Sequence, residues 1–222
     1  MDDMNFERAR YNMVEQQLRP WTVLDPDVLE TLGSLPREHF VPAAYRRLAY
    51  ADTRIPIGHG QTMMAPVIEG RLLQSLEILP EDRILEIGTG TGYLSACLAR
   101  LGSHVDSVDI HEDLVAGARE SLDRLGIDNV SLASGDAARG WSGDRPWDVI
   151  VLTGAVPEVP EAYLHALAPG GRLFAIRGEE DRPIMEAVRI SRIDRDEWAT
   201  ESLFETWIAV LQNAARPRRF EF

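Results

Sequence analysis

A short apolar run followed by three glycines at alternate positions constrains this chain more than any other feature. The run, Ile84–Ile87, has the length and residue type of a buried strand. Gly88, Gly90 and Gly92 follow it, and apolar residues then recur at helical spacing up to Leu101. Glycine lacks the Cβ that would keep a ligand away from the backbone, and the start of a helix adds the positive end of its dipole. Strand, glycine turn and helix together predict a ligand-binding turn in an α/β domain.

The spacing of these glycines favours S-adenosylmethionine over a dinucleotide. A dinucleotide site usually reads G-x-G-x-x-G, whereas this chain reads E-x-G-x-G-x-G, with Glu86 near the end of the strand. A carboxylate there would repel a pyrophosphate, but it could accept a hydrogen bond from the ammonium group of S-adenosylmethionine. The lack of G-K-[ST] in this stretch excludes a P-loop. A structural turn that binds no ligand is the alternative.

Composition narrows the class of protein. The chain has 222 residues and a formal net charge of −13, which disfavours a nucleic-acid substrate and an anionic membrane as partners. The single cysteine, Cys97, allows no intrachain disulfide and is expected to be a small buried apolar residue. No apolar run approaches the roughly 18 residues of a membrane span. The acidic N-terminus is not typical of a signal peptide, so we expect a cytoplasmic protein.

The periodicity divides the chain into two regions. Residues 1–80 are expected to form an N-terminal helical and loop region packed on the core, with an amphipathic helix over 5–19 that Pro20 ends. Residues 56–66 have little periodicity and are interpreted as a loop, either a lid or substrate wall or a plain connector. Residues 81–222 are expected to form the S-adenosylmethionine-binding α/β core with a strand-rich C-terminal extension.

Strands and helices alternate through the second region. We expect strands over 104–110, 130–134, 147–153 and 172–176, and helices over 112–125 and 158–167. This alternation predicts a doubly wound, mostly parallel, Rossmann-like sheet. Segments 184–193 and 203–211 are expected to add an antiparallel edge at the C-terminus. The tail 216–222 is expected either to pack back or to fray.

Acidic residues fall at the ends of the predicted strands, where ligands bind in open α/β sheets. Asp109 closes the second strand, 21 residues after Gly88, at the spacing from which a carboxylate reaches ribose hydroxyls. Asp136 follows Gly135 after the third strand and could accept from an adenine amino group. Asp106 lies at an odd spacing from Asp109 and is expected on the opposite face.

These motifs resemble the class I S-adenosylmethionine-dependent methyltransferases, and the flanking segments resemble one family among them. The segments that resemble the protein-L-isoaspartate O-methyltransferase family are Met13–Arg19, Leu35–Pro42, Tyr50–Asp52, Ile55–Thr62 and Leu85–Tyr93. General methyltransferases lack the Gly58–Thr62 motif, which makes it the most specific of these.

The resemblance implies a cofactor, a substrate and a set of site residues. The substrate would be the carboxylate of an L-isoaspartyl residue in a damaged protein or peptide, and its methyl ester would then cyclise to a succinimide. The active site would contain His59, Thr62 and Met64. The residues expected to hold S-adenosylmethionine are Gln61, Thr62, Glu86, Ile87, Gly88, Thr89, Gly90, Gly92, Asp109, Ile110, Gly135, Asp136 and Ala137.

One position departs from the family pattern. Where the family has a serine associated with the active site, this chain has Met64, which cannot donate a hydrogen bond to a carboxylate. A small molecule, or a carboxyl group in a dedicated peptide, is therefore an alternative acceptor, in a more apolar pocket lined by Met63 and Met64. If that acceptor were a hydroxyl, His59 would be the nearest candidate base, unless it is simply a loop histidine bound to backbone. A non-catalytic protein that binds the cofactor is the second alternative.

The remaining histidines do not indicate a metal site. His39, His104, His111 and His165 are too scattered for metal-ligand spacing, and we expect no metal. The oligomeric state cannot be predicted from these patterns.

Overall fold

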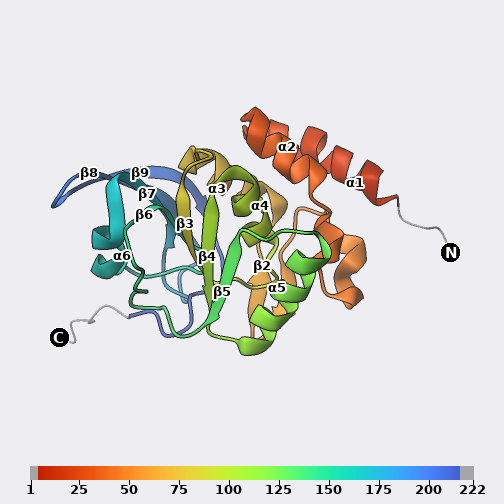
Figure 1. Cartoon of the computed structure of the whole chain (residues 1–222). Coiled ribbons are helices and arrows are strands. Elements are labelled where there is room, and N and C mark those ends of the chain that lie inside the picture. Colours follow the sequence, from red (N-terminus) through yellow and green to blue (C-terminus); the bar gives the residue numbers. More distant parts are fainter. Residues whose placement is uncertain (1–4, 216–222) are drawn as a thin grey trace.

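The computed structural model describes residues 5–215, which form one large sheet, one small sheet and surrounding helices (Figure 1). The large sheet has seven strands in the order β5-β4-β3-β6-β7-β8-β9. Strands β3 to β7 pair in parallel, and β8 pairs antiparallel with both of its neighbours. The predicted mostly parallel sheet with an antiparallel C-terminal edge is confirmed. The strands are β3 Arg83–Ile87, β4 His104–Asp109, β5 Val130–Ser134, β6 Trp147–Leu152, β7 Leu167–Arg177, β8 Met185–Asp194 and β9 Glu197–Thr206.

Helices cover both faces of this sheet. Leu72, Leu98 and Leu122 of three successive helices belong to one hydrophobic core, which also holds Met13 of the N-terminal region. Tyr163 of the last helix belongs to a second core on the other face. The helices are α1 Phe6–Met13, α2 Pro26–Ser34, α3 Pro66–Leu76, α4 Tyr93–Leu101, α5 Glu112–Arg124 and α6 Glu161–Ala166. Cys97 is fully buried in α4, as expected, and burial raises the pKa of its thiol.

The order of the strands creates a switch point beside β3. From β3 the chain moves outward through β4 to β5, and it then crosses to the opposite side of β3 to form β6 and β7. In open α/β sheets the crevice at such a point lies beyond the carboxyl ends of the strands and is where ligands bind. The turn after β3 and the ends of β4 and β6 therefore meet at one place.

The N-terminal helix is less regular than its periodicity predicts. The α-helix ends at Met13 and continues as a π-helical turn, Val14–Leu18, and a 3-10 turn, Arg19–Trp21. Pro20 has no N–H to donate, so it cannot continue a regular helix. The predicted stop at Pro20 is therefore slightly early: Pro20 lies inside the 3-10 turn, and the helical run ends after Trp21, at Thr22 with a φ of 62°.

Residues 56–66 are not wholly a loop, and that part of the prediction is wrong. Strands β1 Ile55–Gly58 and β2 Gln61–Met63 pair antiparallel as a two-stranded sheet. Their turn has φ of 102° at Gly58, 52° at His59 and 71° at Gly60. Glycine adopts such angles freely, and the pairing is too short to leave an alternating pattern in the sequence. We call residues 55–64 the hairpin.

The chain after β9 returns to the centre of the sheet. Ala155 and Val210 form a bridge, and the Leu211 amide donates to the Ala155 carbonyl at 2.8 Å. The prediction for the tail 216–222 concerns residues outside those that the structure describes. Within the described part of the chain, none of the helices has the length and apolar character needed to cross a bilayer.

Candidate functional site

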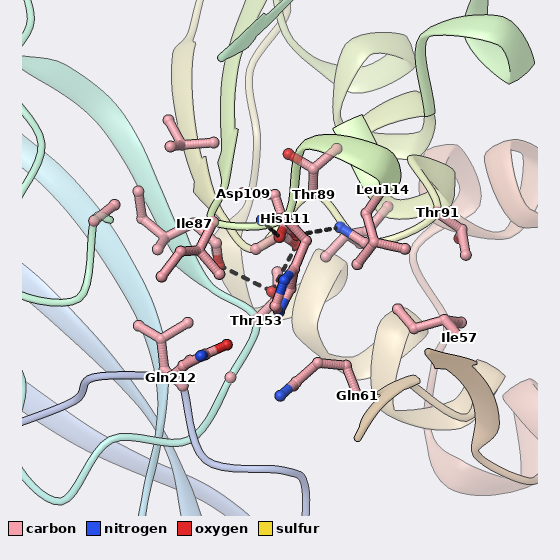
Figure 2. Close-up of a pocket in the computed structure, with 18 of the residues that line it drawn as sticks. Ile57, Gln61, Ile87, Thr89, Thr91, Asp109, His111, Leu114, Thr153 and Gln212 are labelled. Carbon is pink, nitrogen blue, oxygen red and sulfur yellow. Dashed lines mark hydrogen bonds between the residues drawn. The ribbon is translucent and has the colours of Figure 1, made fainter. Parts of the chain in front are cut away.

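One pocket lies at the switch point and brings the predicted segments together. Its empty space amounts to about 840 Å³, open solvent at its mouth included. The hairpin contributes Ile57 and Gln61 on one side, and the ends of the sheet strands contribute Ile87 and Thr153 on the other (Figure 2). Predicted site residues on its wall are Gln61, Thr62, Met64, Ile87, Gly88, Thr89, Gly90, Asp109, Ile110, Gly135, Asp136 and Ala137.

The glycine turn and Asp109 are joined by hydrogen bonds. The Gly90 amide donates to Asp109 Oδ2 at 2.8 Å, and the His111 amide donates to Oδ1 at 2.9 Å. Each carboxylate oxygen keeps a further lone pair for a ligand. Gly88 has a φ of 100°, and a Cβ there would lie 2.1 Å from Thr153 Oγ1. The turn therefore needs glycine at this position, both for its angle and for the close approach of β6.

Asp136 lies on the same wall but is more exposed. Its Oδ1 accepts from the Ala138 amide at 3.0 Å, and its Oδ2 accepts from Asn213 Nδ2 at 2.9 Å. The adjoining Ala137 is buried and belongs to the second hydrophobic core. The apolar surface at Ala137 is suited to the face of a flat heterocycle, and the partly exposed Asp136 carboxylate is suited to its amino group.

The hairpin forms the opposite wall, and Arg37 fixes the position of its last residue, Met64. Met64 is only 7% exposed, and its carbonyl accepts a 2.6 Å hydrogen bond from Arg37 Nη2. Arg37 is completely buried, forms an ion pair with Glu69 of α3, and lies with its guanidinium carbon 4.6 Å from the centre of the Tyr93 ring. Burial raises the pKa of Glu69, and the charge of Arg37 opposes that rise. The Arg37–Glu69 pair thus holds the Met64 backbone against α3 and α4.

Three predicted site residues are not on the pocket wall. Gly92 has a φ of 84° at the start of α4, and a Cβ there would lie 2.9 Å from Ala118 Cβ, so this glycine allows α4 to pack against α5. His59 is at the tip of the hairpin, outside the wall. Glu86 is the third.

Glu86 lies on the face of β3 that α4 covers. Successive residues of a strand point to opposite faces, and Ile87 is the one that lines the pocket. Glu86 is completely buried and accepts hydrogen bonds from Ser95 and Ser107, the latter at 2.6 Å. Burial raises the pKa of Glu86 to about 8, although the bonds from Ser107 and Ser95 lower it. In this arrangement its carboxyl group does not face the pocket.

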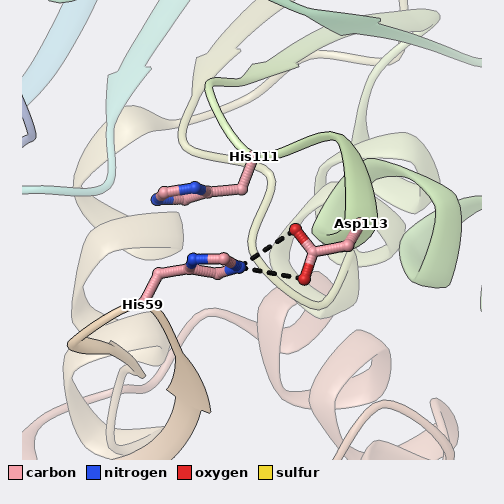
Figure 3. Close-up of side chains that lie close together, drawn as sticks. All are labelled: His59, His111 and Asp113. Carbon is pink, nitrogen blue, oxygen red and sulfur yellow. Dashed lines mark hydrogen bonds and ion pairs between the residues drawn. The ribbon is translucent and has the colours of Figure 1, made fainter.

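His59 contacts the segment after β4 rather than the pocket interior. Its Nε2 lies 2.9 Å from Asp113 Oδ2, and its ring stacks on that of His111 with 3.8 Å between centroids (Figure 3). The hydrogen bond from His59 holds the pKa of Asp113 below its ordinary value. The two rings therefore join the hairpin tip to the start of α5 at the edge of the pocket.

Several wall residues were not predicted from the sequence. Thr153 directly follows β6, and the rule that identified Asp109 and Asp136 would have identified it too. Glu69, Leu211 and Gln212 come from distant segments, and no local pattern marks them. Other unpredicted wall residues are Ile57, Thr91, Tyr93, Leu94, Val108, His111, Leu114, Ala138 and Gly154.

The wall fits an adenosine with a charged extension. The apolar side chains of Ile87, Val108 and Leu114 could cover a base, while Asp109 offers acceptor oxygens for paired hydroxyls. The close backbone at Gly88 and Gly90 leaves room for the linking part of such a ligand.

Comparison with known proteins agrees with this geometry. Residues 8–208 match the family model for protein-L-isoaspartate(D-aspartate) O-methyltransferase (PCMT). The chain is 40% identical over 188 residues to a protein-L-isoaspartate O-methyltransferase of Koribacter versatilis, covering 85% of each chain. It is also 40% identical over 199 residues to protein-L-isoaspartate O-methyltransferase 2 of Pelobacter propionicus, covering 90% of this chain and 88% of that protein.

A solved structure has the same fold over almost the whole chain. It was assigned as a protein-L-isoaspartate O-methyltransferase from Plasmodium falciparum and was solved with S-adenosyl-L-homocysteine. Its TM-score is 0.79 at 22% identity, with 95% of this chain and 99% of that chain covered. With the family model spanning nearly all of the chain and relatives at 40% identity, this chain belongs to the protein-L-isoaspartate O-methyltransferase family.

Proposed function

We propose that this chain is an S-adenosylmethionine-dependent O-methyltransferase that methylates the carboxylate of L-isoaspartyl residues in proteins or peptides. Membership of the family supports the reaction. The observation that carries the assignment of the site is the single pocket that joins the glycine turn, Asp109 and Asp136 to the hairpin wall.

The donor would be held on the sheet side of the pocket. S-adenosylmethionine supplies an electrophilic methyl group on a sulfonium ion. We assign the ribose hydroxyls to Asp109, whose two oxygens are oriented by the backbone amides of Gly90 and His111. Asp136 and the apolar side chains around Ala137 would bind the adenine. The contact predicted between Glu86 and the ammonium group has no support in this arrangement, because Glu86 faces α4.

The acceptor would lie at the hairpin wall formed by Gln61, Thr62, Met63 and Met64. All four side chains are uncharged, which suits an acceptor that needs no base. A carboxylate is already ionised at pH 7, so one of its oxygens can attack the methyl carbon as the carbon–sulfur bond breaks. Catalysis then depends on alignment and exclusion of water, for which Thr62 offers a hydroxyl donor and Met63 and Met64 offer apolar cover.

His59, the candidate base for a hydroxyl acceptor, is already paired with Asp113. His59 Nε2 is engaged with Asp113 and is outside the wall, so we assign it no part in proton removal. No observation favours a small-molecule acceptor or a non-catalytic role over the reaction of the family.

Methyl transfer to matched peptides tests the proposal. The purified chain is incubated with methyl-labelled S-adenosylmethionine and either an L-isoaspartyl peptide or its aspartyl twin. We expect a base-labile methyl ester on the isoaspartyl peptide alone, followed by release of methanol as the succinimide forms. Binding of S-adenosylhomocysteine, measured by calorimetry, serves as the control for a competent pocket. Binding without label in either peptide would contradict the proposed acceptor.

A further inference from the structure

The edge of the pocket brings together three metal-ligating side chains that are distant in the sequence. His59 comes from the hairpin tip, and His111 and Asp113 come from the start of α5 (Figure 3). One ligand atom from each lies within 4.8 Å of the others, and among the described residues this is the one group of three that does so. The expectation of no metal was based on spacing along the chain, which does not register this contact across the fold.

We propose that His59, His111 and Asp113 form a binding site for a divalent transition-metal ion of the zinc class, which would join the hairpin to α5. The proposal goes beyond the methyl-transfer reaction and does not depend on it.

His59 and Asp113 already meet as a nitrogen–carboxylate pair. His59 Nε2 lies 3.0 Å and 2.9 Å from the two oxygens of Asp113, so both oxygens surround one ring nitrogen. An ion bound by the same atoms would lie between them and need bonds of about 2.0–2.2 Å. Because His59 is 38% and Asp113 69% exposed, both side chains can make this adjustment.

His111 supplies the third ligand after a side-chain rotation. Its ring is stacked on His59 with an angle of 11° between the planes, so the nitrogen lone pairs of the two rings do not point to one place. Binding of an ion therefore requires this ring to turn out of the stack so that one of its nitrogens faces Asp113. His111 Nε2 is buried and has no hydrogen-bond partner, so the rotation breaks no polar contact of that atom.

The ligand set determines the class of ion. Two imidazoles and one carboxylate are typical of zinc and its neighbours, whereas magnesium and calcium prefer oxygen ligands alone. Three protein ligands leave a position for water, as in open zinc sites. The net charge of −13 also raises the concentration of cations near the surface.

The backbone keeps the ligands in place. Gly58 and Gly60 flank His59 and all three residues have positive φ, which fixes the tight turn that carries the ring. His111 N–H donates to Asp109 Oδ1 at 2.9 Å, which anchors the start of α5 beside the turn. A bound ion would therefore link two elements whose backbones are already positioned, at the entrance to the cofactor pocket.

Titration of the full-length, cofactor-free chain with Zn²⁺ tests this site. Calorimetry, or competition with a chromophoric chelator, should show one saturable site of micromolar affinity. We expect Asp113→Asn and His111→Gln each to weaken Zn²⁺ binding at least about tenfold, which corresponds to about 1.4 kcal/mol. His59→Asn should do the same, and asparagine tolerates the positive φ at this position.

His165→Ala is the matched control, because His165 also pairs with a carboxylate, Glu161, at 3.3 Å, but without a third ligand. This variant should bind Zn²⁺ like the unmodified chain. A second readout is the thermal midpoint, which Zn²⁺ should raise in the unmodified chain and in His165→Ala but not in Asp113→Asn. The proposal is overturned if no saturable binding occurs, or if the Asp113 and His111 variants bind as tightly as the unmodified chain. Neither result bears on methyl transfer, because cofactor and peptide are absent.

Discussion

Glu86 is a carboxyl group that the fold keeps without access to water. Ser95 and Ser107 donate to one of its oxygens, and the other, Oε1, has no partner. Burial is the main reason why its pKa rises to about 8. Near neutral pH the folded chain therefore holds a proton at Glu86 that an unfolded chain would release.

This difference predicts a dependence of stability on pH. An exposed glutamate has an ordinary pKa of 4.5, so between about pH 4.5 and 8 the folded state binds more protons than the unfolded state. The contribution of Glu86 to stability is thus complete below that range and is lost as the pH rises through it. Glu86→Gln should remove this loss and reduce the fall in unfolding free energy between pH 5 and 8 by about 3 kcal/mol.

Urea unfolding of both proteins at the two pH values measures the effect. Glu30→Gln, at an exposed position of α2, is the control and should leave the pH dependence unchanged. Equal pH dependence in the unmodified chain and Glu86→Gln would show that Glu86 ionises normally in the fold.

Met64 presents a buried thioether where the family pattern has a serine. Met64→Ser should give the isoaspartyl carboxylate a hydroxyl donor, and a hydrogen bond to a charged group contributes about 1.5–3 kcal/mol. We therefore expect KM for the isoaspartyl peptide to fall about tenfold. The folded state should lose about 2 kcal/mol, because a buried side chain becomes smaller. Steady-state kinetics with Met63→Ser as the matched control tests this, and an unchanged or higher KM for Met64→Ser would contradict it.

At the scale of elements, the hairpin depends on a buried ion pair. Arg37 holds both Glu69 of α3 and the carbonyl of Met64, and nothing in the local sequence of either segment indicates this pairing. Arg37→Leu alone should cost about 3–5 kcal/mol of unfolding free energy, because it leaves the Glu69 carboxylate buried without a partner.

Arg37→Leu combined with Glu69→Leu should recover most of that stability, since no buried charge remains. Methyl transfer should stay low in the double variant, because the Met64 carbonyl has lost its donor. Denaturant unfolding and peptide methylation of both variants separate the two effects. A double variant as unstable as Arg37→Leu would mean that Arg37 acts through packing on Tyr93 and not through its charge.

The same elements show how far the sequence could predict the site. The sequence predicts the position of Asp109 and Asp136 on the pocket wall because strand ends and the glycine turn are local features with fixed spacing. The position of Glu86 in the glycine motif predicts a contact with the ammonium group of the cofactor. In the fold, the alternation of side chains along β3 turns Glu86 toward α4 instead. The hairpin was missed because two very short strands leave no periodic signal, and Gly58 and Gly60 alone indicate only a turn.

At the scale of the whole molecule, the end of the chain completes the pocket that its middle begins. Residues after β9 return along Gly154 and Ala155, and both Leu211 and Gln212 reach the wall. Gln212 is labelled in Figure 2. A pairing between residues so far apart could not be predicted from composition or periodicity. The fold thus brings the N-terminal hairpin, the central sheet and the C-terminal segment to one site.

Gly154→Ala should disturb the packing of the C-terminal segment against the pocket. A Cβ at Gly154 would lie 2.9 Å from Leu211 Cα, which is backbone and cannot move aside easily. We expect the affinity for S-adenosylhomocysteine to fall about tenfold, a loss of about 1.4 kcal/mol, with the sheet still folded. Gly117→Ala is the control, since a Cβ there meets nothing within 4 Å. Calorimetric titration measures both, and equal affinities would show that the C-terminal segment does not shape the cofactor site.

A crystal structure of the full chain with S-adenosylhomocysteine would show directly whether donor and acceptor share this pocket. We expect the ribose hydroxyls to contact Asp109, the adenine to lie beside Asp136, and the sulfur to face Thr62 and Met64 of the hairpin. A homocysteine sulfur turned away from the hairpin, or an adenosine bound elsewhere, would contradict the assignment of donor and acceptor to this pocket.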